Sequence, residues 1–183
     1  NKPGASQLAP LQKADLETEP EIARVRYDNG FGRPYLWPVA YAQEIKFLVV
    51  HHTASTNNLD NPVLAMQNLY YYHAVRRGWG DVGYNYIIDP KGNIYEGRQG
   101  GDKVVAGHAR NVNKVSVGIA IMGNYDNEEI PTPVLRSLLT LTKHLGKKFT
   151  IDPEGSAEYK GITYKTVMGH RDSNATTCPG DFL

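Results

Sequence analysis

The sequence contains very little cysteine, and it has neither long apolar runs nor an excess of one charge. Cys178 is the only cysteine among 183 residues, which excludes an intrachain disulfide framework and leaves its thiol as a buried apolar group, a nucleophile or a metal ligand. Apolar runs such as Phe47 to Val50 are only a few residues long, whereas a membrane helix needs about 20 apolar residues, so no transmembrane segment is expected. The 20 Lys and Arg residues are balanced by 19 Asp and Glu residues, which disfavours a nucleic-acid partner.

The length of the chain fits one globular domain with an additional tail, since domains typically contain about 100–200 residues. Residues 1–35 are expected to form an N-terminal tail or linker, because this stretch is polar and contains Pro3, Pro10 and Pro20. The folded domain is then expected over residues 36–183.

Segments typical of strands alternate with segments typical of helices. One helix is expected to begin after the capping residue Asn61 and to end at Gly78, and a second to be capped by Thr132 and to end at Gly146. The leucines expected to be buried on the second helix are Leu135, Leu138, Leu139, Leu141 and Leu145. Strands are expected over residues 45–50, 84–88, 94–96, 115–122 and 163–168. This pattern predicts a single α/β domain with a central mixed β-sheet flanked by α-helices.

Two histidines follow predicted strands, and the single cysteine lies nearby in the sequence. His51 ends the first core strand, His170 ends the last strand, and Cys178 follows eight residues later in a loop. Neutral imidazoles and a thiolate are ligands that zinc prefers, and three protein ligands with an open fourth position are typical of a catalytic site. Spacing alone leaves open the alternative that the three are ordinary core or surface residues, because six histidines in a chain of this length are unremarkable. Since neighbouring strand residues point to opposite faces, only one of His51 and His52 is expected to face a metal ion.

Six short motifs, in a fixed order over residues 44–180, resemble those of the zinc-dependent N-acetylmuramoyl-L-alanine amidases, a family that includes the peptidoglycan recognition proteins and the amidase-type phage lysozymes. The motifs are Phe47-Leu-Val-Val-His-His-Thr-Ala-Ser55, Gly78-Trp-Gly-Asp-Val-Gly-Tyr-Asn-Tyr86, Gly92-Asn-Ile-Tyr-Glu-Gly-Arg98, Gly107-His-Ala-Arg110, Ser116-Val-Gly-Ile119 with Met122-Gly-Asn-Tyr125, and Gly169-His-Arg-Asp172 with Cys178-Pro-Gly180. Each motif is weak alone, but six in register are specific.

The resemblance assigns roles to individual residues. It implies that His51, His170 and Cys178 are ligands of a Zn²⁺ cofactor at the edge of the sheet, in a groove. It implies that Tyr84 and Thr176 are catalytic, and that His108 and Asn113 bind the substrate. The family also continues past the cysteine motif into a final helix, which we expect to be missing from the domain over residues 36–183.

The activity implied by the resemblance is hydrolysis of the amide bond between N-acetylmuramic acid and L-alanine in peptidoglycan. The expected partner is thus a peptidoglycan or muropeptide substrate, bound by a monomer located outside the cell or in the cell envelope. One alternative is a sensor domain that binds peptidoglycan without cutting it, although such relatives typically lack the cysteine. Another is a hydrolase in which Cys178 attacks the substrate directly and His51 or His170 acts as the base.

Overall fold

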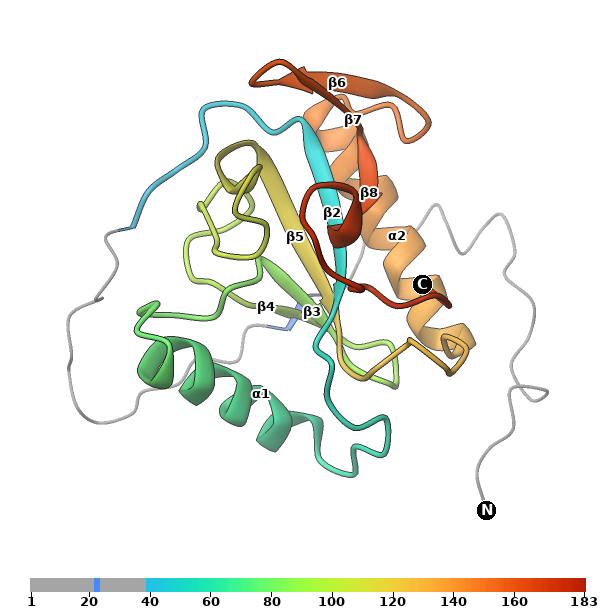
Figure 1. Ribbon diagram of the computed structural model, residues 1–183. Coiled ribbons are helices and arrows are strands. Elements are labelled where there is room, and N and C mark those ends of the chain that lie inside the picture. The colour runs from blue at the N-terminus through green and yellow to red at the C-terminus, as the bar shows by residue number, and fades with distance from the viewer. Residues whose placement is uncertain (1–21, 24–38) are drawn as a thin grey trace.

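The computed structural model describes residues 22–23 and 39–183, and a six-stranded β-sheet lies at its centre (Figure 1). The order of strands across this sheet is β1-β4-β3-β5-β2-β8. The strands are β1 (Ile22–Ala23), β2 (Phe47–His52), β3 (Tyr86–Ile88), β4 (Ile94–Glu96), β5 (Ser116–Ile121) and β8 (Val167–Gly169). β3 and β4 are antiparallel, whereas the other neighbouring strands are parallel, so the sheet is mixed as predicted.

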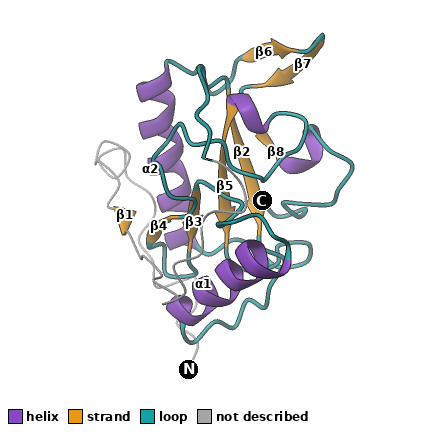
Figure 2. Ribbon diagram, turned by 90° about the vertical axis from the view of Figure 1, so that its left-hand side faces the viewer, coloured by secondary structure: helices purple, strands orange, loops and turns teal. Residues whose placement is uncertain are grey.

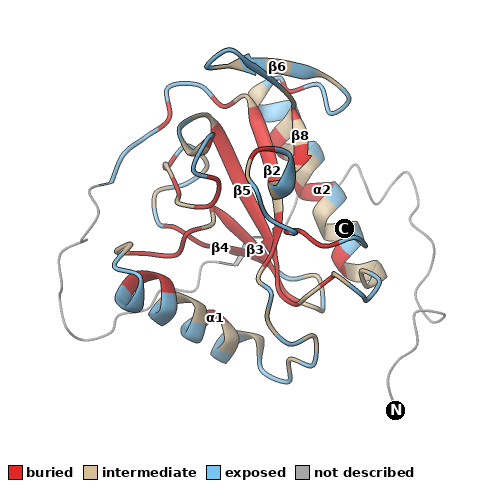
Figure 3. Ribbon diagram, viewed as in Figure 1, coloured by how far each residue is buried: buried red, intermediate tan, exposed pale blue. Residues whose placement is uncertain are grey.

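One helix covers each side of the sheet. α2 (Thr132–Phe149) lies along one face, and α1 (Pro62–Tyr70) lies on the opposite side near the carboxyl ends of β2 and β5 (Figure 2). Parallel strands are usually covered on both faces, and the middle strands here are accordingly buried along their length (Figure 3). The predicted single α/β domain is confirmed.

The alternation of side chains along β5 gives the two faces of the sheet different chemistry. Val117, Ile119 and Ile121 point into the core beneath α2. Ser116, Gly118 and Ala120 point to the other face, where their small size leaves room for additional side chains. That second face is the one on which the candidate site is built.

The first predicted helix is confirmed at both ends. The Asn61 side chain accepts a hydrogen bond from the Leu64 backbone N–H at 3.1 Å, and Pro62 is the first helical residue. The backbone then widens into a π-helix, η3 (Tyr71–Arg76), before Gly78 turns the chain with a φ of 70°. His73, in η3, is buried.

The second predicted helix begins and ends differently from the prediction. Pro131 occupies the N-cap position instead of Thr132, and the helix continues through Gly146 to Phe149. The last turn packs closely around Gly146: the Ile151 backbone N–H bonds to the Gly146 carbonyl at 2.8 Å, and a Cβ at Gly146 would lie 3.3 Å from the Ile151 carbonyl oxygen, a tight contact. The prediction of the buried face is partly wrong. Leu141 and Leu145 are fully buried and Leu138 packs against the core, but Leu135 and Leu139 are 36% and 38% exposed.

The prediction of one last strand over residues 163–168 is wrong, because this segment contains parts of two strands. β7 (Ile162–Lys165) pairs with β6 (Ser156–Tyr159) in a separate two-stranded sheet, and only β8 joins the central sheet. Thr166 separates the two strands, and its hydroxyl donates to the Asp152 carbonyl. Smaller differences occur at other boundaries: β2 extends through both histidines, and Tyr84 lies two residues before β3.

The predicted tail contains one described element, since β1 pairs with β4 from within residues 1–35. The predicted boundary between residues 35 and 36 lies outside the described residues.

Candidate metal centre

His51 reaches the candidate site because β2 alternates its side chains between the two faces. Phe47 and Val49 pack on the face opposite α2, and His51 continues that series. His52 points the other way, where its Nδ1 accepts a hydrogen bond from the Tyr125 backbone N–H at 3.3 Å. The expectation that the two histidines diverge therefore agrees with the contacts they make.

The loop after β8 brings His170 and Cys178 to the same place. His170 begins the short helix η5 (His170–Asp172), directly after the strand that pairs with β2. The backbone N–H of Arg171 donates to the Cys178 carbonyl at 2.8 Å, which folds the loop back on itself. Asn111 contributes a further restraint, because its side-chain amide donates to the Ser173 carbonyl at 2.6 Å.

These elements bring together a cluster of three possible metal ligands. One side-chain donor atom from each of His51, His170 and Cys178 lies within 4.8 Å of the other two. The Cys178 Sγ is 3.7 Å from the His51 Nδ1, and the centroids of the two imidazole rings are 4.5 Å apart. His51 is 1% exposed and Cys178 is 9% exposed.

The electrostatic surroundings favour uncharged forms of all three groups. Burial lowers the pKa of His51 well below its ordinary value, and the neighbouring His108 and His170 lower it further. The pKa of His170 is lowered by burial and by His52. Burial raises the pKa of the Cys178 thiol to about 11, so the metal-free thiol is protonated at neutral pH. Neutral imidazoles are already in the form that binds a metal, whereas the thiol must lose a proton on binding.

His108, predicted to bind substrate, contacts His51 directly. Its Nδ1 is 3.0 Å from the His51 Nε2, and its Nε2 is 3.3 Å from the Ser116 hydroxyl. His108 is only 7% exposed, and burial, followed by the effect of His170, lowers its pKa to about 3. The Asn113 side-chain oxygen accepts hydrogen bonds from the His108 and Ala109 backbone N–H groups at 3.0 and 2.6 Å.

The two residues predicted to be catalytic, Tyr84 and Thr176, contact different members of the cluster. The centroid of the Tyr84 ring is 5.2 Å from that of His51, and burial together with the nearby Cys178 raises the pKa of its hydroxyl. Thr176 is exposed in the loop, and its hydroxyl accepts a hydrogen bond from the Cys178 backbone N–H at 3.2 Å. Tyr84 is thus packed against a candidate ligand, while Thr176 holds the backbone of another.

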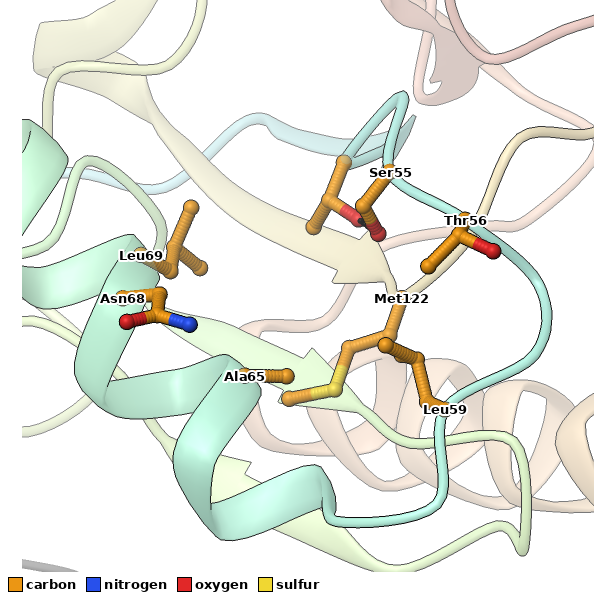
Figure 4. A pocket seen from close by; sticks show the side chains of 8 residues that line it. Ser55, Thr56, Leu59, Ala65, Asn68, Leu69 and Met122 are labelled. Carbon is orange, nitrogen blue, oxygen red and sulfur yellow. Dashed lines mark hydrogen bonds between the residues drawn. The ribbon is translucent and has the colours of Figure 1, made fainter.

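A pocket of about 270 Å³ opens beside this site, between α1 and the carboxyl ends of β2 and β5 (Figure 4). Its apolar lining consists of Leu59, Ala65, Leu69 and Met122. Its polar lining consists of Thr53, Ser55, Thr56 and Asn68. Because Thr53 follows His51 by two residues on the same chain segment, the pocket is close to the three-residue cluster. The residues that line the pocket come from three separate chain segments, and the short motifs of the sequence did not identify them as parts of one pocket.

Within the described part of the chain, every helix is too short or too polar to cross a membrane. This agrees with the expectation drawn from the short apolar runs.

Comparison with known proteins gives one consistent result. Residues 41–181 match the family model described as N-acetylmuramoyl-L-alanine amidase. Peptidoglycan recognition protein 1 of Bos taurus is 36% identical over 143 residues, covering 77% of this chain and 70% of the relative.

Solved structures share the fold. N-acetylmuramoyl-L-alanine amidase LysC from Clostridium intestinale is 29% identical with a TM-score of 0.70, covering 90% of this chain and 91% of that one. A mutant of Drosophila PGRP-LB in complex with tracheal cytotoxin is 28% identical with a TM-score of 0.68, covering 88% of this chain and 89% of that one. From the family match and these likenesses we conclude that the chain belongs to the N-acetylmuramoyl-L-alanine amidase family, which also contains its peptidoglycan recognition relatives.

Proposed function

We propose that this protein is a zinc-dependent amidase that cleaves the bond between N-acetylmuramic acid and L-alanine in peptidoglycan. The observation that carries the proposal is the convergence of His51, His170 and Cys178, whose donor atoms lie within 4.8 Å of one another. Two imidazoles and one thiolate match the preferences of Zn²⁺, and a set of only three protein ligands suits a catalytic site rather than a closed structural one.

The residues present fit the metal that the family implies. The cluster is largely shielded from solvent, and burial keeps its imidazoles neutral, so two of the three donors need no deprotonation. Zn²⁺ bound by these residues would supply Lewis acidity and lower the pKa of a bound water toward 7.

Tyr84 is proposed to stabilise the charge that develops on the substrate carbonyl oxygen. Its hydroxyl has a raised pKa, so it remains a hydrogen-bond donor at neutral pH, and its ring packs against His51. Thr176 is proposed to help through its hydroxyl, which already contacts the backbone of Cys178. Both side chains would act on the reacting amide without forming a covalent bond to it.

The pocket beside the site is proposed to receive part of the muropeptide. A lining that combines apolar side chains with hydroxyl groups and a side-chain amide suits a ligand that carries methyl groups beside amides. The complex of the Drosophila relative with tracheal cytotoxin supports a ligand of peptidoglycan type. We further propose that the protein acts as a monomer outside the cell or in the cell envelope, where this substrate occurs.

A sensor that binds peptidoglycan without cutting it is the main alternative, and the presence of Cys178 among the three candidate ligands argues against it. A thiol hydrolase is disfavoured because a nucleophilic cysteine needs its thiolate form, whereas burial raises the pKa of the Cys178 thiol.

Digestion of defined muropeptides distinguishes the three functions. Purified protein is incubated with muropeptides of the diaminopimelate and lysine types, and free stem peptides with an N-terminal alanine are measured by mass spectrometry. A zinc amidase releases them, loses activity in a chelator and regains it when Zn²⁺ is restored. Release that persists in chelator but stops after thiol alkylation would indicate the thiol hydrolase, and binding without release from either muropeptide would indicate the sensor.

A further inference from the structure

A continuous chain of hydrogen bonds links the protein backbone to His51. The Ser116 hydroxyl is 2.9 Å from the Val112 carbonyl oxygen and 3.3 Å from the His108 Nε2. The other nitrogen of the same ring, His108 Nδ1, is 3.0 Å from the His51 Nε2. The remaining nitrogen, His51 Nδ1, faces the Cys178 Sγ at 3.7 Å.

The donor and acceptor of each hydrogen bond in this series follow from the first one, between Ser116 and the Val112 carbonyl. A backbone carbonyl can only accept, so the single hydroxyl proton of Ser116 is donated to Val112. The Ser116 oxygen is then left to accept a proton from the His108 Nε2–H, which makes the His108 Nδ1 an acceptor. His51 therefore donates through its Nε2–H to His108, and its Nδ1 carries a lone pair.

His108 is held in this position on several sides. Its ring lies against Gly118, where a Cβ would come within 2.4 Å of the His108 Cγ. Its backbone N–H is fixed by the Asn113 side-chain oxygen. The planes of the His51 and His108 rings are nearly perpendicular, at 88°, with their centroids 5.1 Å apart. A glycine in the middle of a fully buried strand is explained by this close approach, because any larger residue would displace the imidazole.

We propose that His108 and Ser116 are positioning residues that fix the proton of His51 on Nε2 and so leave its Nδ1 free to bind the metal ion. The reverse arrangement would place a proton on Nδ1, between the ring and the Cys178 sulfur, and would block the ligand position. Partners that orient a metal-binding histidine in this way typically change metal affinity about 10- to 100-fold when they are removed. This inference rests on the proposed metal site, but it assigns to His108 a role other than contact with the substrate.

The tautomer of His51 can be measured without metal or substrate. In metal-free protein at a pH where its histidines are neutral, ¹⁵N resonances of the two ring nitrogens identify which one carries the proton. We expect the proton on Nε2 of His51 and on Nε2 of His108. A proton on Nδ1 of His51 in the folded wild-type protein would overturn the proposal. Absence of zinc binding by wild-type protein would instead overturn the proposed function, so the two failures are distinguishable.

Two substitutions of His108 provide a matched comparison. His108→Leu removes the acceptor, so His51 is expected to populate both tautomers and zinc affinity, measured by chelator competition, to fall about 10- to 100-fold. His108→Asn places a carbonyl oxygen near the position of Nδ1, so it is expected to retain the tautomer and most of the zinc affinity. If a folded His108→Leu protein bound zinc as tightly as wild type, the positioning role would be refuted. A contact with substrate alone would leave both readouts unchanged in either variant.

Discussion

At the scale of single residues, the proposed amide hydrolysis depends most directly on the hydroxyl group of Tyr84. Because burial keeps it protonated, it can donate a hydrogen bond to an oxygen that becomes negative in the transition state. We expect Tyr84→Phe to lower kcat about 100- to 1,000-fold while leaving the zinc content unchanged. Steady-state kinetics on a defined muropeptide, with metal analysis of the same sample, would check this.

The matched control for this substitution is Tyr95→Phe. Tyr95 is also buried, but its hydroxyl donates to the Asp89 carboxylate at 3.0 Å in the β3–β4 hairpin. Loss of this bond should reduce stability without a comparable effect on kcat. Equal turnover of Tyr84→Phe and wild-type protein would show that the tyrosine is only a packing residue.

His73 makes the stability of the protein dependent on pH. Burial, followed by the charges of Arg77 and Arg98, lowers its pKa from 6.5 to about 4, and its Nδ1 accepts a hydrogen bond from the Gly83 N–H. Between these two pH values the unfolded chain binds the extra proton and the folded protein does not. This contribution to stability is therefore complete above pH 6.5 and decreases as the pH falls toward 4, by up to about 3 kcal/mol.

Urea unfolding of metal-free wild-type protein and His73→Asn across this pH range would test the effect. Asparagine retains an acceptor for the Gly83 N–H but has no proton to gain. We expect the free energy of unfolding to fall less for the variant between pH 7 and pH 4, with the difference reaching about 3 kcal/mol. Parallel pH profiles for the two proteins would contradict the assignment.

Sequence reasoning at the level of residues succeeded where a local rule applied. The alternation of side chains along a strand predicted that His51 and His52 point to opposite faces, and their separate contacts agree with it, whereas the choice of His51 as the ligand came from the family resemblance. The contact between His108 and His51 depends on the register of β5 against β2, which pairs Ser116 with Phe47. Such a register is a property of the folded sheet, so the role of His108 could not be derived from its motif.

The helix α2 shows how packing determines which of several leucines contributes to stability. Leu141 is fully buried beneath the sheet, whereas Leu139, two residues earlier, is 38% exposed. We expect Leu141→Ala to reduce the free energy of unfolding by about 2–5 kcal/mol, through lost burial and the cavity that remains. Leu139→Ala is the matched control and should cost less than about 1 kcal/mol, because its site is open to solvent. Chemical denaturation of both variants measures the difference, and equal losses would contradict this orientation of the helix.

At the level of elements, apolar spacing located α2 but could not select its buried stripe. Leucines occur around a wide arc of this helix, and only the position of the sheet decides which of them face inward. The division of residues 162–169 between β7 and β8 has a similar origin, because the two strands pair with different neighbours. β7 pairs with β6, and β8 pairs with β2. Strand propensity contains no information about those partners.

At the scale of the whole molecule, the two faces of the central sheet differ in what packs against them. Large apolar side chains of β5 pack beneath α2, while the small ones on the opposite face make space for imidazoles and for the candidate site. The candidate ligands also come from distant parts of the chain, since His51 and Cys178 are 127 residues apart. A metal ion bound by both would connect an early strand of the sheet to the loop that follows its last strand.

Zinc is therefore expected to stabilise the folded protein as a whole. A ligand that binds the folded state alone adds about 2.7 kcal/mol to the free energy of unfolding when its free concentration is 100 times Kd. The expected result is an increase of this size for wild-type protein in reducing buffer with buffered Zn²⁺, measured by urea denaturation. Cys178→Ala should abolish most of the increase because it removes one of three ligands. Leu139→Ala, on the exposed side of α2, leaves all three ligands and their hydrogen-bond partners in place and serves as the control, with most of the increase retained. If zinc stabilised Cys178→Ala as much as wild type, the ion would have to bind elsewhere, and the three-residue cluster would not be the metal site.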